Sequence, residues 1–414
     1  MKKLFSRFLL LVLLLVLFQP ANAQVARVLT LADSLVGGVG GIAVDRLGNV
    51  YSADFMDTVW RIKPDGRVIK FATGLYGPSG NFFDDRGNLL QSNFFGHYIS
   101  IIDRHGNHEV WVDEGLNGPV GITINNDKEV FVVNCNSNSV SKIDANRKAQ
   151  SFAEGELFKC PNGITTGPDG AIYVVNFRDG NVIRVDEQGS ASVFATIPGG
   201  GNGHIAVARG DFYVTAFQTN RVFKVTMEGE VVHLAGTGAF GELDGSPLEA
   251  TFVFPNGIAV DPNRGDRLFV NDYINRTPPG VDFPPVPLAN IRMLKLEAIN
   301  DLLAIGLQSG GIQGLEAAYS AYKSNPSNSG INTERDVNGY GYALMNQNRL
   351  ASAVRLFELN AESYPNSFNA YDSLAESYMN QGRDEEAIAN YEKSLELNAA
   401  NQNALDMIER IKNK

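Results

Sequence analysis

The chain has 414 residues, of which 44% are hydrophobic and 20% are charged, and its formal net charge is −11. This length and composition are typical of a folded protein with two domains rather than of a disordered or fibrous chain. The acidic balance argues against a nucleic-acid partner, because phosphate backbones are bound by an excess of Lys and Arg.

The first 23 residues predict a secretory signal. Lys2, Lys3 and Arg7 precede the apolar run 8–18, and residues 21–23 (Ala-Asn-Ala) have the small side chains of a cleavage site. The run is too short to span a bilayer, and no later apolar stretch reaches spanning length. We therefore expect an exported protein, periplasmic or secreted, with no transmembrane segment once the signal is removed.

A recurring glycine opens each unit of a repeat over residues 24–300. The glycines are Gly41, Gly80, Gly121, Gly163, Gly203 and Gly257. Short alternating or apolar runs follow each one, rich in β-branched and aromatic side chains and separated by Gly, Asn, Asp and Pro turns. Four such runs in a unit predict four antiparallel strands. A four-stranded unit repeated about every forty residues is typical of a propeller blade.

The sixth unit has three predicted strands, the last of them near residues 291–296. A candidate for the missing fourth strand is Arg27–Leu31, at the other end of the repeat region. Closing the ring with this segment would hide the exposed sheet edges. The sequence therefore predicts a six-bladed β-propeller sealed by its N-terminal strand.

Several residues would meet at one end of the propeller axis. The residue after the second strand of each blade is Phe55, Phe94, Cys135, Phe177, Phe217 or Tyr273. If the aromatic side chains face outward they form a cup for a small molecule or glycan, and if they turn inward they fill the space between blades. Arg178 and Arg276 could bind an anion at the same face, although solvated arginine is the ordinary case.

The residues just before the aromatic positions form a second set. They are Asp54, Asn93, Asn134, Asn176 and Asp272. They could form a polar collar around the axis, but Asp and Asn at this position more often bind local backbone amides in turns.

The chain has two cysteines, Cys135 and Cys160, in loops of neighbouring blades that reach the same face. In an oxidising compartment they could form a disulfide. The alternative is two small buried apolar side chains.

The composition changes after residue 300 to Ala, Leu, Tyr, Asn and Glu at helical spacing. Residues 345–349 (MNQNR) recur as residues 379–383 (MNQGR), and this period of thirty-four resembles the tetratricopeptide repeat, a helix–turn–helix unit. The match covers residues 334–398, with flanking helices at 312–324 and 403–412.

We therefore expect a small all-α domain over residues 301–414. The resemblance implies a concave groove that binds a protein or peptide partner. A packing or dimerisation tail is the alternative.

The blades resemble NHL repeats, as residues 255–262 (PNGIAVDP) and 268–272 (LFVND) illustrate. Residues 25–298 also resemble the SMP-30/gluconolactonase group of six-bladed propellers. This second resemblance implies a divalent cation, usually calcium, held by Glu, Asn and Asp side chains around the axis.

The positions that match this metal site are Asn162, Asn202 and Asn256, each directly before a repeat glycine. The family's Glu has no counterpart, because the first blade opens with residues 37–41 (GGVGG). Three amides without a carboxylate make a weak calcium site.

His204 and His97 are the candidate general bases near the axis, although a lone histidine is more often structural. If either acts in catalysis, its pKa should lie near neutrality. The sequence favours an exported binding or scaffold protein, and the alternative is a metal-dependent lactonase or esterase.

Overall fold

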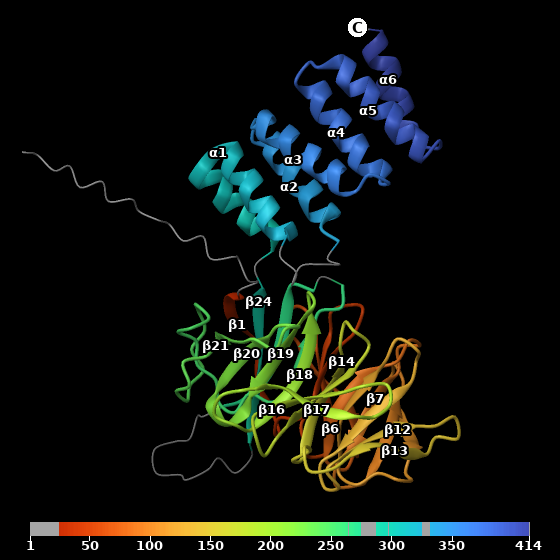
Figure 1. The fold of residues 1–414 in the computed structure, drawn as a ribbon, viewed down its shortest axis with the longest axis vertical. Coiled ribbons are helices and arrows are strands. Elements are labelled where there is room, and N and C mark those ends of the chain that lie inside the picture. Colours follow the sequence, from red (N-terminus) through yellow and green to blue (C-terminus); the bar gives the residue numbers. More distant parts are fainter. Residues whose placement is uncertain (1–24, 264, 275–286, 297, 325–331, 414) are drawn as a thin grey trace, which may run out of the picture.

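The computed structural model describes residues 25–413 except 264, 275–286, 297 and 325–331. The predicted signal, residues 1–23, lies outside this range. Across the described residues, the strands form six antiparallel sheets of four strands each (Figure 1). The predicted six-bladed propeller is therefore confirmed.

The first five blades follow the chain in order. Blade one holds β2 (Ile42–Val44), β3 (Val50–Ala53), β4 (Thr58–Ile62) and β5 (Val68–Thr73). Blade two holds β6 (Pro78–Phe83), β7 (Leu89–Asn93), β8 (Tyr98–Ile102) and β9 (His108–Val112). Blade three holds β10 (Pro119–Ile124), β11 (Val130–Asn134), β12 (Ser139–Ile143) and β13 (Ala149–Glu154). Blade four holds β14 (Pro161–Thr166), β15 (Ile172–Asn176), β16 (Asn181–Val185) and β17 (Ala191–Thr196). Blade five holds β18 (Asn202–Ala208), β19 (Asp211–Ala216), β20 (Arg221–Val225) and β21 (Val231–Ala235).

The sixth blade joins both ends of the propeller sequence. Its strands are β22 (Ile258–Val260), β23 (Arg267–Tyr273), β24 (Leu288–Leu296) and β1 (Val25–Val36). Strand β1 pairs antiparallel with β24, so that Val28 lies opposite Leu294 and both side chains are fully buried. The N-terminal strand closes the ring as predicted, and it is longer than the five residues expected.

A buried arginine reinforces this closure. Arg292 in β24 donates from Nη2 to Asp244 Oδ1 at 2.8 Å and from Nη1 to the Thr251 carbonyl at 2.9 Å. The other oxygen of Asp244 accepts from the Thr30 amide of β1 at 2.8 Å. One guanidinium therefore links the closing pair of strands to the connection between blades five and six.

The repeat glycines allow the innermost strands to approach one another backbone to backbone. A Cβ atom on Gly80 would lie 2.2 Å from the Val120 carbonyl oxygen and 2.6 Å from the Cα of Gly121. At Gly163 it would lie 2.6 Å from the Cα of His204. Real Cβ atoms do not make contacts this short, so packing around the axis accounts for the glycine period in the sequence.

Six helices follow the propeller in the described residues. They are α1 (Ile299–Ser324), α2 (Glu334–Asn346), α3 (Leu350–Ser363), α4 (Phe368–Asn380), α5 (Asp384–Leu397) and α6 (Gln402–Lys412). The repeat-related pairs Ala353 and Ala387, and Phe357 and Tyr391, are all fully buried in the helical core. The predicted helix 312–324 is the second half of α1, which is kinked at Gly310 and Gly311. No helix among the described residues is long and apolar enough to cross a membrane.

The helices lie beyond one end of the propeller (Figure 1). Burial raises the pKa of Tyr322 in α1, and the Arg209 guanidinium in the β18–β19 turn opposes this rise. Helix α1 therefore adjoins the end of the axis that carries the turns between first and second strands. The aromatic positions lie at the opposite end, after the second strands.

Candidate ligand-binding mouth of the propeller

A cavity of about 420 Å³, here named the mouth, opens where the second strands of the blades end. Its lining includes all five aromatic side chains of the predicted set: Phe55, Phe94, Phe177, Phe217 and Tyr273. Each of the five is half-buried. The aromatics therefore serve both of the alternatives that the sequence left open, since they pack against neighbouring blades and also line a cavity.

The aromatic contacts run from blade to blade around the rim. Phe55 and Phe94 lie with ring centroids 5.5 Å apart, and Phe177 and Phe217 lie 5.3 Å apart. A further stacked ring, Phe254, lies 5.0 Å from Phe217. Tilted and edge contacts of this kind add to the stabilisation from burial alone.

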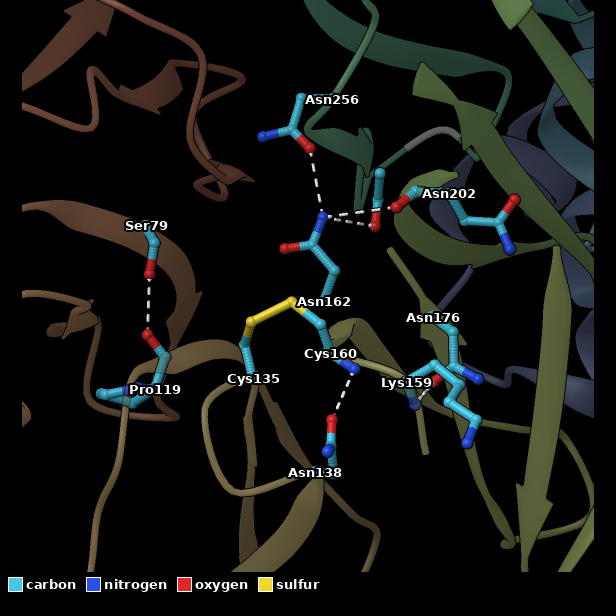
Figure 2. Close-up of a disulfide and its surroundings, with 11 residues drawn as sticks. Ser79, Pro119, Cys135, Asn138, Lys159, Cys160, Asn162, Asn176, Asn202 and Asn256 are labelled. Carbon is cyan, nitrogen blue, oxygen red and sulfur yellow. Dashed lines mark hydrogen bonds between the residues drawn. A yellow bond between two sulfur atoms is a disulfide. The ribbon is translucent and has the colours of Figure 1, made fainter. Parts of the chain in front are cut away.

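A disulfide joins Cys135 to Cys160 (Figure 2). It belongs to a buried cluster against which Phe94 and Phe177 pack. Both sulfurs belong to residues that line the mouth. Of the two alternatives for the cysteines, the structure has the disulfide. It links blades three and four, whereas ring contacts link blades one and two (Phe55 and Phe94) and blades four and five (Phe177 and Phe217).

Three polar side chains at the floor of the mouth form hydrogen bonds from one blade to the next. They are here named the seam residues, and each lies directly before a repeat glycine. Their bonds run from Ser79 Oγ to the Pro119 carbonyl at 2.9 Å, from Asn162 Nδ2 to the Gly203 carbonyl at 2.9 Å, and from Asn256 Nδ2 to the Val39 carbonyl at 2.7 Å. Blades two, four and six thus each donate to the next blade around the ring, and Figure 2 shows the bonds made by Ser79 and Asn162.

Sequence reasoning missed Ser79 as a member of this set. The signal was available, because Ser79 precedes Gly80 as Asn162 precedes Gly163 and Asn256 precedes Gly257. A search for metal ligands among amide and carboxylate side chains does not include serine. A search for side chains that donate hydrogen bonds between blades would have included it.

The three amides expected around a cation do not fit that role in this geometry. Asn256 Oδ1 accepts from Asn162 Nδ2 at 3.3 Å, so one potential ligand oxygen is already bonded. The Asn202 side chain points away from Asn162 in Figure 2, and its Nδ2 lies 3.5 Å from the Asn181 carbonyl. Among the described residues, no cluster of three or more His, Cys, Asp or Glu side chains is arranged for a metal. Calcium prefers six to eight oxygens and several carboxylates, so this donor set does not match it.

The two candidate histidines occupy different environments. His204 is buried in β18 between the mouth and a second cavity further along the axis. Burial lowers the pKa of His204 to about 4, so its ring is uncharged at neutral pH. His97 lies in the turn after β7, where its Nδ1 accepts the Gly118 amide at 2.8 Å. The lowered pKa of His204 and the bonded Nδ1 of His97 therefore do not favour either residue as a general base.

The collar positions hold the loops that enter each blade. Asn93, Asn134 and Asn176 each accept, through Oδ1, the amide of the residue seventeen positions earlier. Asp54 accepts instead the amides of the turn that follows it, from Met56 to Thr58. These bonds support the structural interpretation of the collar.

Arg178 lies exposed at the rim of the mouth, and it is the only charged side chain among the described residues that line this cavity. Arg276 lies outside the described residues. The mouth is therefore predominantly apolar and aromatic, with a floor of amide, hydroxyl and imidazole groups.

The second cavity, here named the far cavity, occupies the opposite end of the axis and measures about 820 Å³. Its lining includes Asp45, Arg46, Asp84, Asp85 and Arg86 from turns between first and second strands. It also includes Arg61 from β4 and Arg104 from the turn between β8 and β9. His204 borders both cavities. The two ends of the axis thus differ in chemistry.

Comparison with known proteins identifies the helical repeat and the propeller fold. Residues 368–401 match the family model of the tetratricopeptide repeat. The propeller is similar to an auxiliary nutrient binding protein from Bacteroides ovatus, with 14% identity, a TM-score of 0.52, and coverage of 67% of this chain and 78% of that chain. No curated protein gives a match.

Two further solved structures show the same fold. An auxiliary nutrient binding protein from Bacteroides thetaiotaomicron has 16% identity and a TM-score of 0.53, over 66% of this chain and 76% of that chain. A gluconolactonase from Xanthomonas campestris has 17% identity and a TM-score of 0.51, over 66% of this chain and 92% of that chain. At these identities the likeness extends to the fold alone, since one fold supports many functions.

Proposed function

We propose that this protein is an exported binding protein that takes up a ligand at the mouth of its propeller and contacts a protein partner through its helical repeats. The observation that carries the first part is the lining of the mouth, where five aromatic side chains and a disulfide surround a floor of polar groups. A concave, mainly apolar cavity with a few converging polar groups is the usual form of a small-molecule site. Its volume of about 420 Å³ lies within the range of such sites.

The chemistry of the mouth favours binding over hydrolysis. The nitrogens of Asn162 and Asn256 are engaged between blades, and the His204 ring has a pKa far below neutrality. A lactonase of the type that the sequence resembles needs a cation to polarise a carbonyl or activate water. The amides present do not form such a site, so we derive no catalytic step.

The helical part supports the second half of the proposal. The segment that matches the tetratricopeptide repeat follows a closely related unit formed by α2 and α3. Repeats of this kind stack and expose an extended concave surface, which suits a protein or peptide partner.

The ligand proposal is tested by isothermal titration of the chain lacking residues 1–23 with 2-methoxynaphthalene, a neutral two-ring probe. We expect saturable one-to-one binding that weakens at least about fivefold in Phe177→Ala, because a ring that lines the mouth is removed. Leu47→Ala is the control, because Leu47 is exposed in the far-end turn of blade one. Equal binding by the Phe177 variant would contradict a ligand site at the mouth.

The same preparation tests the hydrolase alternative. If the mouth is a binding site alone, adding Ca²⁺ to the protein with a panel of lactones gives no turnover above that of buffer. Turnover that requires Ca²⁺ and disappears in Asn256→Ala would replace the binding proposal with the enzymatic one.

A further inference from the structure

The hydrogen atoms of the seam residues are already used within the protein. Ser79 donates its single hydroxyl hydrogen to Pro119, and Asn256 donates its amide hydrogens toward Val39 and Gly40. Asn162 donates toward Gly203 and toward Asn256 Oδ1. What these side chains still offer to the mouth is therefore lone pairs on oxygen.

The Asn162 oxygen is the clearest of these acceptors. Because its Nδ2 is fixed by carbonyl partners, the orientation of the amide is determined, and Oδ1 must lie on the other side. Figure 2 shows this oxygen directed away from the carbonyl partners, toward the space that separates Asn162 from Ser79. Both residues line the mouth.

His204 adds a buried polar atom to the same region. Its side chain is 8% exposed, and Nε2 has no hydrogen-bond partner among the described residues. A buried polar atom without a partner is unfavourable because it has lost its bonds to water, so a ligand group that bonds it recovers part of that loss. The imidazole borders the mouth from below and is well placed to receive such a group.

Charge discriminates between ligand classes. An anion would approach lone pairs on Ser79 and Asn162 that repel it, with the exposed Arg178 as the only cation in the described lining. A cation would lose its hydration in an apolar cavity whose described lining contains no carboxylate. A neutral group that donates a hydrogen bond meets neither cost.

Resting on the proposed function, we propose that the mouth selects neutral ligands that have an apolar, ring-sized body and a hydroxyl or similar hydrogen-bond donor at the inner end. The body packs among the aromatic side chains of the rim. The donor reaches the acceptors of the floor, which are Ser79 Oγ, Asn162 Oδ1 and, in the tautomer protonated at Nδ1, His204 Nε2. The recognised feature is the donor, and not merely a polar atom, because the hydrogens of Ser79 and Asn162 are already bonded within the protein.

The test compares three matched probes on the unaltered protein at neutral pH: 2-naphthol, 2-methoxynaphthalene and 2-naphthoate. The naphthol donates a hydrogen bond, the ether can only accept one, and the naphthoate is an anion of similar size. We expect 2-naphthol to bind about tenfold more tightly than the ether, which corresponds to one well-made hydrogen bond, and the naphthoate to bind most weakly. This comparison does not depend on the folding of any variant.

Two variants test which residues of the floor cause the preference for a hydrogen-bond donor. Ser79→Ala and His204→Leu should each reduce the ratio of naphthol to ether affinity by a factor of about three or more. Thr123→Val is the matched control, because the Thr123 hydroxyl pairs with Thr166 in the lining of the far cavity. Circular dichroism of each variant verifies the fold.

The outcomes separate the two proposals. Equal affinity for naphthol and ether, or tighter binding of naphthoate, would overturn the donor preference and leave a ligand site at the mouth. Failure of all three probes to bind would overturn the proposed function itself.

Discussion

The two ends of the propeller axis are built from the same six blades, yet they present opposite chemistry. The mouth is the smaller cavity, about 420 Å³, and its described lining has one charged side chain, Arg178. The far cavity is about 820 Å³ and is surrounded by aspartates and arginines. Volume and charge alone would favour the far cavity as the functional site.

The hydrogen bonds of the charged side chains in the far cavity favour the mouth as the functional site. At the far end, Asp45 accepts the amides of Leu47 and Asn49 within its own turn. Asp84 does the same in blade two, accepting from Arg86 and Asn88. These carboxylates shape the turns that the repeat needs. The mouth instead retains oxygen lone pairs and a buried imidazole nitrogen, so it is the end with capacity left for a ligand.

The largest loss of stability is expected from a change in the innermost strands, which surround the axis between the two cavities. Gly80→Ala would place a methyl group 2.2 Å from the Val120 carbonyl, which the neighbouring strand cannot move away from without separating blades two and three. We expect a loss of more than about 4 kcal/mol, or no folded propeller at all. Urea unfolding followed by tryptophan fluorescence measures it.

Gly339→Ala provides the control, because this glycine lies exposed in α2 with nothing within 4 Å of the added methyl. Alanine there should stabilise the helix by up to about 1 kcal/mol. A tolerated alanine at position 80 would show that the repeat glycines do not mark the axial contact.

The next effect tests the rim of the mouth. The disulfide spans 25 residues of sequence and replaces an aromatic contact between blades three and four. Replacing both Cys135 and Cys160 by alanine should cost about 3 kcal/mol of stability, chiefly through the freed unfolded chain. It should also weaken probe binding at the mouth, because both cysteines line the cavity and belong to the buried cluster against which Phe94 and Phe177 pack.

Reduction of the unaltered protein with dithiothreitol should reproduce both losses, and the double variant should no longer respond to the reductant. If the variant keeps its stability but loses probe affinity, the bridge shapes the mouth without holding the blades. Unchanged affinity would mean that the rim does not depend on the bridge.

A smaller effect concerns the residue between the two cavities. Because the pKa of His204 is lowered from 6.5 to about 4, the unfolded chain binds a proton below pH 6.5 that the folded chain does not. Folding stability therefore falls as the pH drops from 6.5 toward 4, and this group alone should cost about 2 kcal/mol between pH 7 and pH 5. Unfolding in urea at a series of pH values should show this slope.

The slope should be reduced in His204→Gln and kept in His105→Gln, since His105 is exposed. An unchanged slope in the first variant would show that other groups govern the acid sensitivity. A steeper slope would mean that His204 gains rather than loses protons on folding.

Much of this architecture could be predicted from the sequence, because its causes are local or periodic. The axial glycines, the turn residues such as Asp54 and Asn93, and the repeated pentapeptide of the helices each recur at a fixed interval. The closing strand was predictable because an open sheet edge needs a partner. These features show in the sequence as pattern.

The candidate site was less predictable because it depends on which atoms are already bonded. Asn162 and Asn256 line the mouth, but their donation to Gly203 and Val39 follows from the spacing of blades, which no residue type reveals. The sequence also gives no prediction for residues 299–309 of α1, since the predicted flanking helix begins at residue 312.

The smallest effect on probe affinity is expected from removing an arginine at either end of the axis, and this change tests the difference in charge between the two ends. Arg178 at the rim and Arg104 in the far cavity are both arginines of the axial openings. If the mouth binds neutral ligands, Arg178→Gln should change the affinity for 2-methoxynaphthalene by less than about twofold, because an exposed charge contributes little to a neutral contact. Arg104→Gln should change it no more, and affinity should be nearly constant between low and physiological salt. Binding of 2-naphthoate that weakens with salt and depends on Arg178 would instead indicate that the rim arginine recognises an anion. The two ends would then differ in charge density, and the mouth would not be selective for neutral ligands.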